Sequence, residues 1–231
     1  MGYYYMGYGF VIIAAILSMI AQSYVKSSYN KFSRIATSKG MSGAQIAQYI
    51  LTRNGITDVQ VVESRNGLLS DHFDPNKKIV ALSPEVFRNS SIASVAVAAH
   101  EVGHAIQYDT GYFGIKIRTM VLGPAIVASK LSGIFIMIGI LFINSTVGIM
   151  FDIGIILLGV VTLFQILTLP IEFDASSRAL KNIQSEGLLV SSEYSGAKTM
   201  LQAAALTYVA AAAGSIMNLM RFIMIRNSRR D

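Results

Sequence analysis

Long apolar stretches alternate with polar segments along this chain, and their lengths predict several membrane-spanning helices. Residues 9–25 carry no charge, follow a tyrosine-rich start and are long enough to cross a bilayer core of about 30 Å. Residues 121–169 are almost continuously apolar, which suffices for two spans and a tight turn at Asn144-Ser145-Thr146. A last apolar stretch, 199–225, is rich in alanine. The pattern therefore predicts three to four transmembrane helices.

The first apolar stretch is predicted to be a retained anchor rather than a cleaved signal peptide, because it lacks a basic n-region and a small-x-small cleavage site. Lysine and arginine follow it at once, so the positive-inside rule places that flank in the cytoplasm and the N-terminus outside. The last stretch conflicts with this orientation, since its own basic tail, residues 226–230, would then lie outside. Either that stretch does not span fully or the rule fails at one end.

The polar segment after the anchor predicts a helix followed by two short strands. The helix covers residues 42–54, where Ser42 and Gln45 form a capping box and the following glycine ends it. The strands cover residues 58–63 and 78–82. Turns are expected between them, at Asn66-Gly67 and Asp74-Pro75-Asn76.

A second helical region follows these strands. Ser83-Pro84-Glu85 begins a short helical turn, with proline at a favourable first position. A longer helix from about 91 to 108 is capped by Ser90 or Ser91. Only a short apolar run, 92–99, precedes its polar residues, so this helix is predicted to be buried in a small domain and not to span.

Composition supports a membrane protein. Hydrophobic residues make up 53% of the chain and charged residues only 14%, against about 25% in soluble domains, and mean hydropathy is +0.52. The net charge of +6 comes from basic residues at the edges of apolar runs, which suits anionic lipid better than nucleic acid. Lys130 lies inside a predicted span, where it either snorkels or faces a polar cavity. The absence of cysteine excludes disulfides and thiolate metal sites.

The pentapeptide at residues 100–104, His-Glu-Val-Gly-His, carries the candidate chemistry. Two histidines four positions apart project from the same side of a helix, so His100 and His104 can bind one metal ion. Glu101 between them is placed to take a proton from a water at that metal. The alternative is a helix that carries polar residues on a buried face by chance, at the free-energy cost of burying them without partners.

A catalytic zinc site needs a third protein ligand. The metzincin pattern would put glycine and histidine at positions occupied by Gln107 and Thr110, which excludes that class. The remaining candidates are His72, Glu172 and Asp174, the last two at the start of a predicted helix that follows a span.

The order of these segments resembles a known family. The motif at 100–104, two spans, and then residues 172–176 on a second helix resemble the membrane gluzincins, which include the HtpX-type heat-shock proteases and the CAAX-processing proteases. The closer resemblance is to the YugP-like neutral membrane zinc metallopeptidases, and it covers nearly the whole chain. It is carried by the motif and by Asp-His-Phe-Asp-Pro at 71–75, Leu-Ser-Pro-Glu-Val at 82–86, Pro-Ile-Glu-Phe-Asp-Ala-Ser at 170–176 and Ala-Ala-Leu-Thr-Tyr at 204–208.

This resemblance implies one zinc ion per chain, held by His100, His104 and Glu172, with Glu101 as general base. The HtpX pattern has an aspartate four residues after the ligand glutamate, where this chain has Ser176. Serine can supply a hydrogen bond there but no charge. Asp174 lies about 200° around a helix from the ligand glutamate and is therefore expected to point away from the metal.

Three further residues are weaker candidates for contacting substrate or polarising its carbonyl. His72 is either a loop histidine bonded to Asp71 or Asp74, or lies near the cleft. Tyr208 lies in an alanine-rich helix, where a tyrosine is more often a core residue with a hydrogen-bonded hydroxyl. For Arg178 the more common role of an arginine is a salt bridge, and the partner expected here is Glu186 or Asp174.

The fold class predicted is an α+β membrane protein: a mostly helical, zincin-like catalytic domain with a small β-hairpin or sheet, plus three to four transmembrane helices. The predicted parts are a transmembrane anchor (1–25), a zincin-like part (26–118), a transmembrane hairpin (119–171), a third-ligand helix and connection (172–198), and an apolar helix with basic tail (199–231).

The function predicted is a zinc endopeptidase of the bacterial cytoplasmic membrane, with its active site facing the cytoplasm and membrane-associated or unfolded proteins as substrates. Residues 78–82 are expected to bind the substrate as an added strand. The expected partners are protein or peptide substrates and the lipid bilayer, with no nucleic acid; the oligomeric state is not set by the sequence. A site-2 protease is excluded, because the motif lies outside the spans and no Asp-Gly pair is present. A catalytically silent metal-binding scaffold or chaperone-like protein stays as the alternative.

Overall fold

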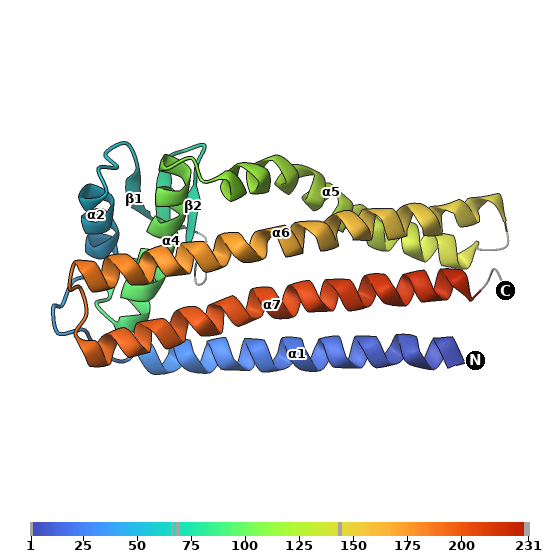
Figure 1. Cartoon of the computed structure of the whole chain (residues 1–231), viewed down its shortest axis with the longest axis horizontal. Helices are drawn as coiled ribbons and strands as arrows, with labels where there is room; N and C mark the ends of the chain where they lie inside the picture. The colour runs from blue at the N-terminus through green and yellow to red at the C-terminus, as the bar shows by residue number, and fades with distance from the viewer. Residues whose placement is uncertain (1, 66, 68–69, 143–144, 229–231) are drawn as a thin grey trace. The chain divides into compact units, whose positions relative to one another are not determined.

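The computed structural model describes residues 2–65, 67, 70–142 and 145–228, with side chains from Tyr8 onward (Figure 1). Asn66, Asn144 and residues 229–231 of the predicted turns and tail lie outside the described residues. The chain forms two compact units. The four-helix unit comprises Met1–Gln22, Ile117–Leu169 and Thr207–Asp231, and the HExxH unit comprises Ser23–Lys116 and Pro170–Leu206.

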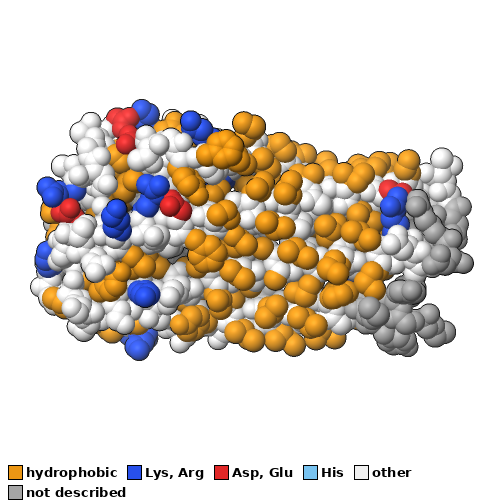
Figure 2. Space-filling model, in the orientation of Figure 1, with side chains coloured by type: hydrophobic (Ala, Val, Ile, Leu, Met, Phe, Trp, Pro, Cys, Tyr) orange, Lys and Arg blue, Asp and Glu red, His pale blue; other side chains and the backbone are white. Residues whose placement is uncertain are grey.

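Four of the described helices are long and apolar enough to cross a membrane, by length and composition. They are α1 (Gly2–Phe32), α5 (Phe113–Leu141), α6 (Ile149–Ser185) and α7 (Ser191–Asn227). Hydrophobic side chains cover much of their visible surface, whereas charged side chains gather over the HExxH unit (Figure 2). The prediction of a mostly helical membrane protein with three to four spans and a small sheet is confirmed.

The four-helix unit is held together by close helix packing. At Gly139 of α5 a Cβ would lie 2.1 Å from the backbone nitrogen of Phe151 on α6, so only glycine permits this approach. Helices α6 and α7 are linked by a hydrogen bond between Thr162 Oγ1 and Ser215 Oγ, 2.8 Å apart. Helices α5 and α6 join at the predicted turn, through η1 (Thr146–Gly148).

Helix α6 differs from the prediction. The sequence predicts a span that stops near Pro170 and a separate helix over 172–186, but the structure forms one helix that ends before Gly187, at φ +57°. Proline removes one backbone hydrogen bond, and a long helix held by packing on both sides of that point tolerates this loss. Glu172 therefore lies within a continuous helix rather than at the start of a new one.

The HExxH unit begins with the predicted capped helix, α2 (Gly43–Arg53). The backbone N–H of Ser42 donates to Gln45 Oε1 at 2.9 Å, and Ser42 Oγ accepts from the backbone N–H of Gln45 at 3.3 Å, which is the predicted capping box. Gly55 follows the helix at φ +75°, a conformation that favours glycine, as predicted.

The sheet has three strands rather than the two predicted, in the order β1-β3-β2. Strands β1 (Gln60–Glu63) and β3 (Ile79–Leu82) were expected, and they pair in parallel. Strand β2 (His72–Asp74) pairs antiparallel to β3, and the turn at Asp74 after it is confirmed by a 2.9 Å hydrogen bond from the Asn76 N–H. The prediction missed β2 because its three residues are too few for a period-2 pattern to be recognised, and its pairing depends on tertiary contacts.

This topology corrects one prediction directly. Residues 78–82 contain β3, which is the central strand, and both of its edges are already paired. They therefore cannot bind a substrate as an added strand.

Helix α4 (Ile92–Asp109) is the buried centre of the HExxH unit. It follows the short helix α3 (Pro84–Arg88), and Ser91 caps it by accepting from the backbone N–H of Ser94 at 3.1 Å. Its apolar residues are almost wholly buried, and α4 is not among the described helices that could span. This agrees with the prediction of a core helix. The core around it includes Ile46, Ile50, Leu51, Val80, Leu82, Val95, Ala98, Val102 and Ile183.

Asp71 ties the start of β2 to the end of β3. Its Oδ1 accepts from the backbone N–H of Ser83 at 2.7 Å and from Ser83 Oγ at 3.0 Å. Burial raises the pKa of the Asp71 carboxyl, and these hydrogen bonds oppose the rise without cancelling it. The folded state therefore holds the Asp71 proton more tightly than the unfolded chain, so this carboxyl lowers stability as the pH rises from the usual aspartate pKa through the raised one.

We predict that Asp71→Asn is at least as stable as the parent at pH 7, because the amide oxygen still accepts from Ser83 and the buried charge is gone. Asp71→Ala leaves both Ser83 donors unsatisfied and should lose about 1–3 kcal/mol. Thermal unfolding of detergent-solubilised protein tests this, and the advantage of Asp71→Asn should shrink at pH 5. Equal losses in the two variants would contradict this account of Asp71.

Candidate metal centre

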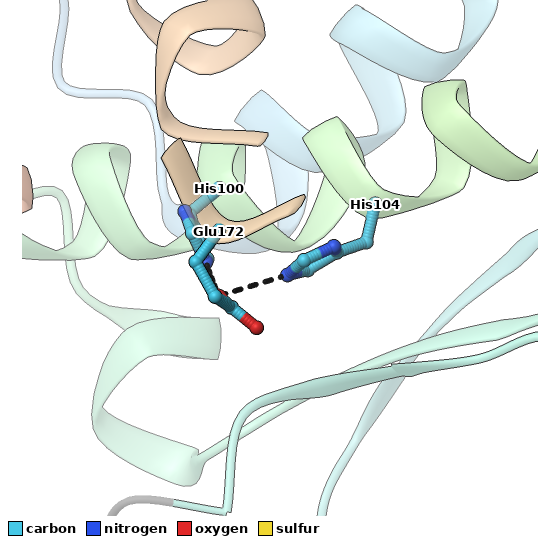
Figure 3. A group of neighbouring side chains, drawn as sticks. All are labelled: His100, His104 and Glu172. Carbon is cyan, nitrogen blue, oxygen red and sulfur yellow. Dashed lines mark ion pairs between the residues drawn. The ribbon is translucent and has the colours of Figure 1, made fainter. Parts of the chain in front are cut away.

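His100 and His104 lie one turn apart on α4 and project from the same side of the helix (Figure 3). Their ring centroids are 4.9 Å apart and the rings are nearly perpendicular. Both side chains are largely buried, at 12% and 8% exposure. This is the geometry that the spacing of the motif predicts.

Glu172 reaches the two histidines from α6. Its Oε2 lies 3.3 Å from His100 Nε2 and 3.4 Å from His104 Nε2, and its side chain is 2% exposed. Ligand atoms of the three residues all lie within 4.8 Å of one another. The structure thus brings together the three residues that the resemblance implied as zinc ligands.

Close packing of α4 against α6 makes this convergence possible. A Cβ on Gly103 would lie 2.5 Å from the carbonyl oxygen of Ala175, closer than any ordinary contact. The glycine inside the pentapeptide therefore lets the backbone of α6 approach α4 between the two histidines. Glu172 lies almost one turn before Ala175 and so projects toward the histidines.

The other nitrogen of each histidine ring has a partner. Ser176 Oγ lies 3.1 Å from His100 Nδ1, so the serine that replaces the expected aspartate occupies the supporting position beside the motif. Gln107 Oε1 lies 2.9 Å from His104 Nδ1. Such partners fix the ring orientation of a metal-binding histidine.

The partners of Gln107 determine its amide orientation. Its Nε2 donates to the Ile171 carbonyl oxygen and to Asp174 Oδ2, both at 2.8 Å, so its Oε1 is the atom that faces His104. His104 Nδ1 must then carry the proton and donate it to Gln107. That leaves a lone pair on His104 Nε2, which faces Glu172 and is the form that a metal requires.

Asp174 is not among the described residues grouped as possible metal ligands, and its Oδ2 accepts from Gln107 Nε2 at 2.8 Å and from Arg178 Nε at 2.6 Å. The Arg178 guanidinium also lies 5.7 Å from the Tyr112 ring centroid. Arg178 is thus engaged with Asp174, one of the two partners expected for it. The other, Glu186, pairs with Arg53 at 2.8 Å instead.

The remaining sequence candidates lie in different places. Glu101 is on α4 and 9% exposed. His72 lies on strand β2 rather than in a loop, is exposed, and contacts the Ser70 carbonyl oxygen through Nδ1 at 2.8 Å, not Asp71 or Asp74. Tyr208 is half-buried on α7 and belongs to the four-helix unit, whereas the three ligand candidates belong to the HExxH unit.

Gln107 is a residue beside the candidate metal centre that sequence reasoning missed. It was used only to exclude the metzincin pattern, although its position three residues after His104 places it on the same face of α4. It is fully buried, and a buried glutamine needs several hydrogen-bond partners. A search for polar residues at helical spacing from the motif would have found it.

The donor set fits zinc. Two imidazole nitrogens and one carboxylate oxygen are zinc ligands, and three protein ligands are the number that catalytic zinc sites use. A family model described as "putative neutral zinc metallopeptidase" matches residues 7–227. The chain belongs to the neutral zinc metallopeptidase family.

A curated relative supports this membership. The "Putative membrane protease YugP" of Bacillus subtilis (strain 168) is 42% identical over 223 residues, which is 96% of this chain and 97% of the relative. No solved structure matches the chain significantly. The resemblance found in the sequence is confirmed, and the family implies zinc at the centre formed by His100, His104 and Glu172.

In this member of the neutral zinc metallopeptidase family, we predict that Gln107→Leu weakens zinc binding by about 10–100-fold, because His104 loses the partner that fixes its tautomer. Ser176→Ala should have a smaller effect, since a serine partner is uncharged. Competition with a fluorescent zinc chelator measures both affinities. Ser177→Ala, a change at the neighbouring position on α6, is the control and should bind zinc like the parent. Unchanged affinity in Gln107→Leu would exclude this supporting role.

Proposed function

We propose that this protein is a zinc-dependent endopeptidase of the membrane. The observation that carries the proposal is the convergence of His100, His104 and Glu172 on one point, with Glu101 on the same helix as the two histidines. Three protein ligands with a carboxylate beside them are typical of a zinc site that catalyses hydrolysis.

The residues of the centre have different roles in the proposed reaction: metal binding, orientation of the histidine rings and proton transfer. His100 Nε2, His104 Nε2 and a Glu172 oxygen would hold the zinc ion, while Ser176 and Gln107 keep the rings in place. Bound zinc acidifies water and polarises a carbonyl oxygen. Glu101 takes the proton from the attacking water and passes it to the leaving amine of the peptide.

The substrates proposed are membrane-associated or unfolded proteins. Four apolar helices tether the HExxH unit to a bilayer, and the relative from Bacillus subtilis carries the name of a membrane protease. Basic residues directly after the first apolar stretch, Lys26, Lys31 and Arg34, support a cytoplasmic position for the HExxH unit. The membrane would then be the cytoplasmic membrane of a bacterium.

We predict that Glu101→Gln keeps zinc and loses peptide cleavage, because glutamine has a similar shape and cannot carry the proton. The loss should be at least about 100-fold in kcat, the usual worth of a general base. Metal analysis and hydrolysis of a quenched fluorescent peptide library measure the two properties. Retained cleavage would refute Glu101 as the base, and zinc binding with no cleavage by the parent would favour the metal-binding scaffold.

An edge strand is the better place for substrate binding by strand addition. Strand β2 is at the edge of the sheet, and Phe73 in it contacts Tyr108, one turn beyond His104 on α4, with ring centroids 5.9 Å apart. The edge at β2 therefore lies against the helix that carries the motif. We propose that a peptide pairs with β2.

Binding of a peptide hydroxamate inhibitor should slow hydrogen exchange at the outward-facing amides of residues 72–74. The opposite edge, residues 60–63, is the internal control and should exchange at the same rate with and without inhibitor. Exchange measured by mass spectrometry on the zinc-loaded protein tests this. Slowing at β1 alone would place the peptide on the other edge.

A further inference from the structure

Arg221 on α7 stands out within the four-helix unit because its charge lies among aromatic rings. Its guanidinium carbon is 5.7 Å from the Tyr8 ring centroid and 5.1 Å from the Phe222 ring centroid. None of the described carboxylates forms a salt bridge with Arg221, whereas Arg226 pairs with Asp152 at 2.5 Å. The aromatic rings fix the position of this guanidinium and leave its donors available to an anion.

An apolar groove lies beside Arg221 in the same unit. Its volume is about 430 Å³, within the range of small-molecule sites. Met137 and Ile140 of α5 line it together with Phe222 of α7, and Asn218 and Arg221 supply polar groups. An amide and a guanidinium next to an otherwise apolar surface suit a ligand with one anionic group and a long apolar chain.

The position of Arg221 along α7 suits the level of lipid phosphates. It lies six residues before the end of α7 at Asn227, or about 9 Å along the helix axis. The polar headgroup regions add about 5–8 Å to each side of the hydrocarbon core, and arginine reaches outward near the ends of spans. Residues of α5 line the groove from Leu141, the last residue of that helix, back to Ser132, so the groove runs toward the middle of the span.

We propose that Arg221 and Asn218 bind the phosphate of a membrane phospholipid, with one acyl chain in the groove. A guanidinium holds a phosphate through two parallel hydrogen bonds, which are strengthened where water is scarce. The acyl chain adds the burial of apolar surface. This site does not depend on the peptidase activity, and its ligand is a phosphodiester lipid rather than free phosphate.

Full-length protein, delipidated in detergent, tests the proposal by native mass spectrometry. The probes are phosphatidylglycerol, phosphatidylcholine, diacylglycerol with the same chains, and inorganic phosphate. Both phospholipids should bind in a one-to-one complex, while diacylglycerol and inorganic phosphate should not. Diacylglycerol binding as tightly as the phospholipids would overturn the role of the phosphate.

Two substitutions probe the two halves of the site. Arg221→Ala should weaken phospholipid binding about tenfold or more, and Arg221→Lys should fall between it and the parent because it keeps the charge without the planar fork. Met137→Trp should weaken binding by filling the groove. Lys130→Ala removes an exposed cation from α5 of the same unit and is the matched control, with parental binding expected. Parental binding by Arg221→Lys and Met137→Trp, both with parental helix content by circular dichroism, would overturn the proposal even if Arg221→Ala failed to fold.

Discussion

Helices α4 and α6 pack backbone against backbone at Gly103, and the metal centre depends on this contact. The 2.5 Å that would separate a Cβ there from the Ala175 carbonyl oxygen leaves no room for any other residue without movement of a helix. Because the contact lies between His100 and His104 in sequence, it determines where residues of α6 meet the histidines. Glu172 and Ser176 lie on either side of Ala175, so one approach positions both a candidate ligand and the hydrogen-bond partner of His100.

Burying this centre is costly without compensation. A carboxylate and two imidazoles lose water when they are buried, and the Glu172 side chain is 2% exposed. The protein supports the outer nitrogen of each ring with a neutral partner, Ser176 or Gln107, rather than with a second carboxylate. The Asp174 carboxylate is separated from His104 by Gln107 and is balanced by Arg178. A divalent cation held by Glu172 and the two histidines would offset the negative charge of this buried glutamate.

Local sequence rules predicted much of this structure, and tertiary pairing explains most of the rest. The capping box at Ser42, the cap at Ser91 and the side of α4 shared by the two histidines depend on residues within one or two helical turns, so they were visible in the sequence. The pairing of β2 with β3 depends on residues brought together only by folding. The continuation of α6 past Pro170 likewise depends on packing, which overrides the local preference of proline. Glu172 was predicted as the third ligand from the family resemblance, since spacing alone left His72, Glu172 and Asp174 open.

The order of segments also constrains how the centre forms. The HExxH unit consists of two segments, Ser23–Lys116 and Pro170–Leu206, and the residues between them belong to the four-helix unit. His104 and Glu172 are therefore separated in sequence by two predicted spans. Closing such a long loop costs conformational entropy, although the cost grows only slowly with its length. Until α6 docks at Gly103, Glu172 does not lie beside the two histidines of α4. Zinc bound by His100, His104 and Glu172 together would therefore stabilise the state in which α6 is docked relative to states in which it is not. The reason is that binding through Glu172 requires α6 to be docked.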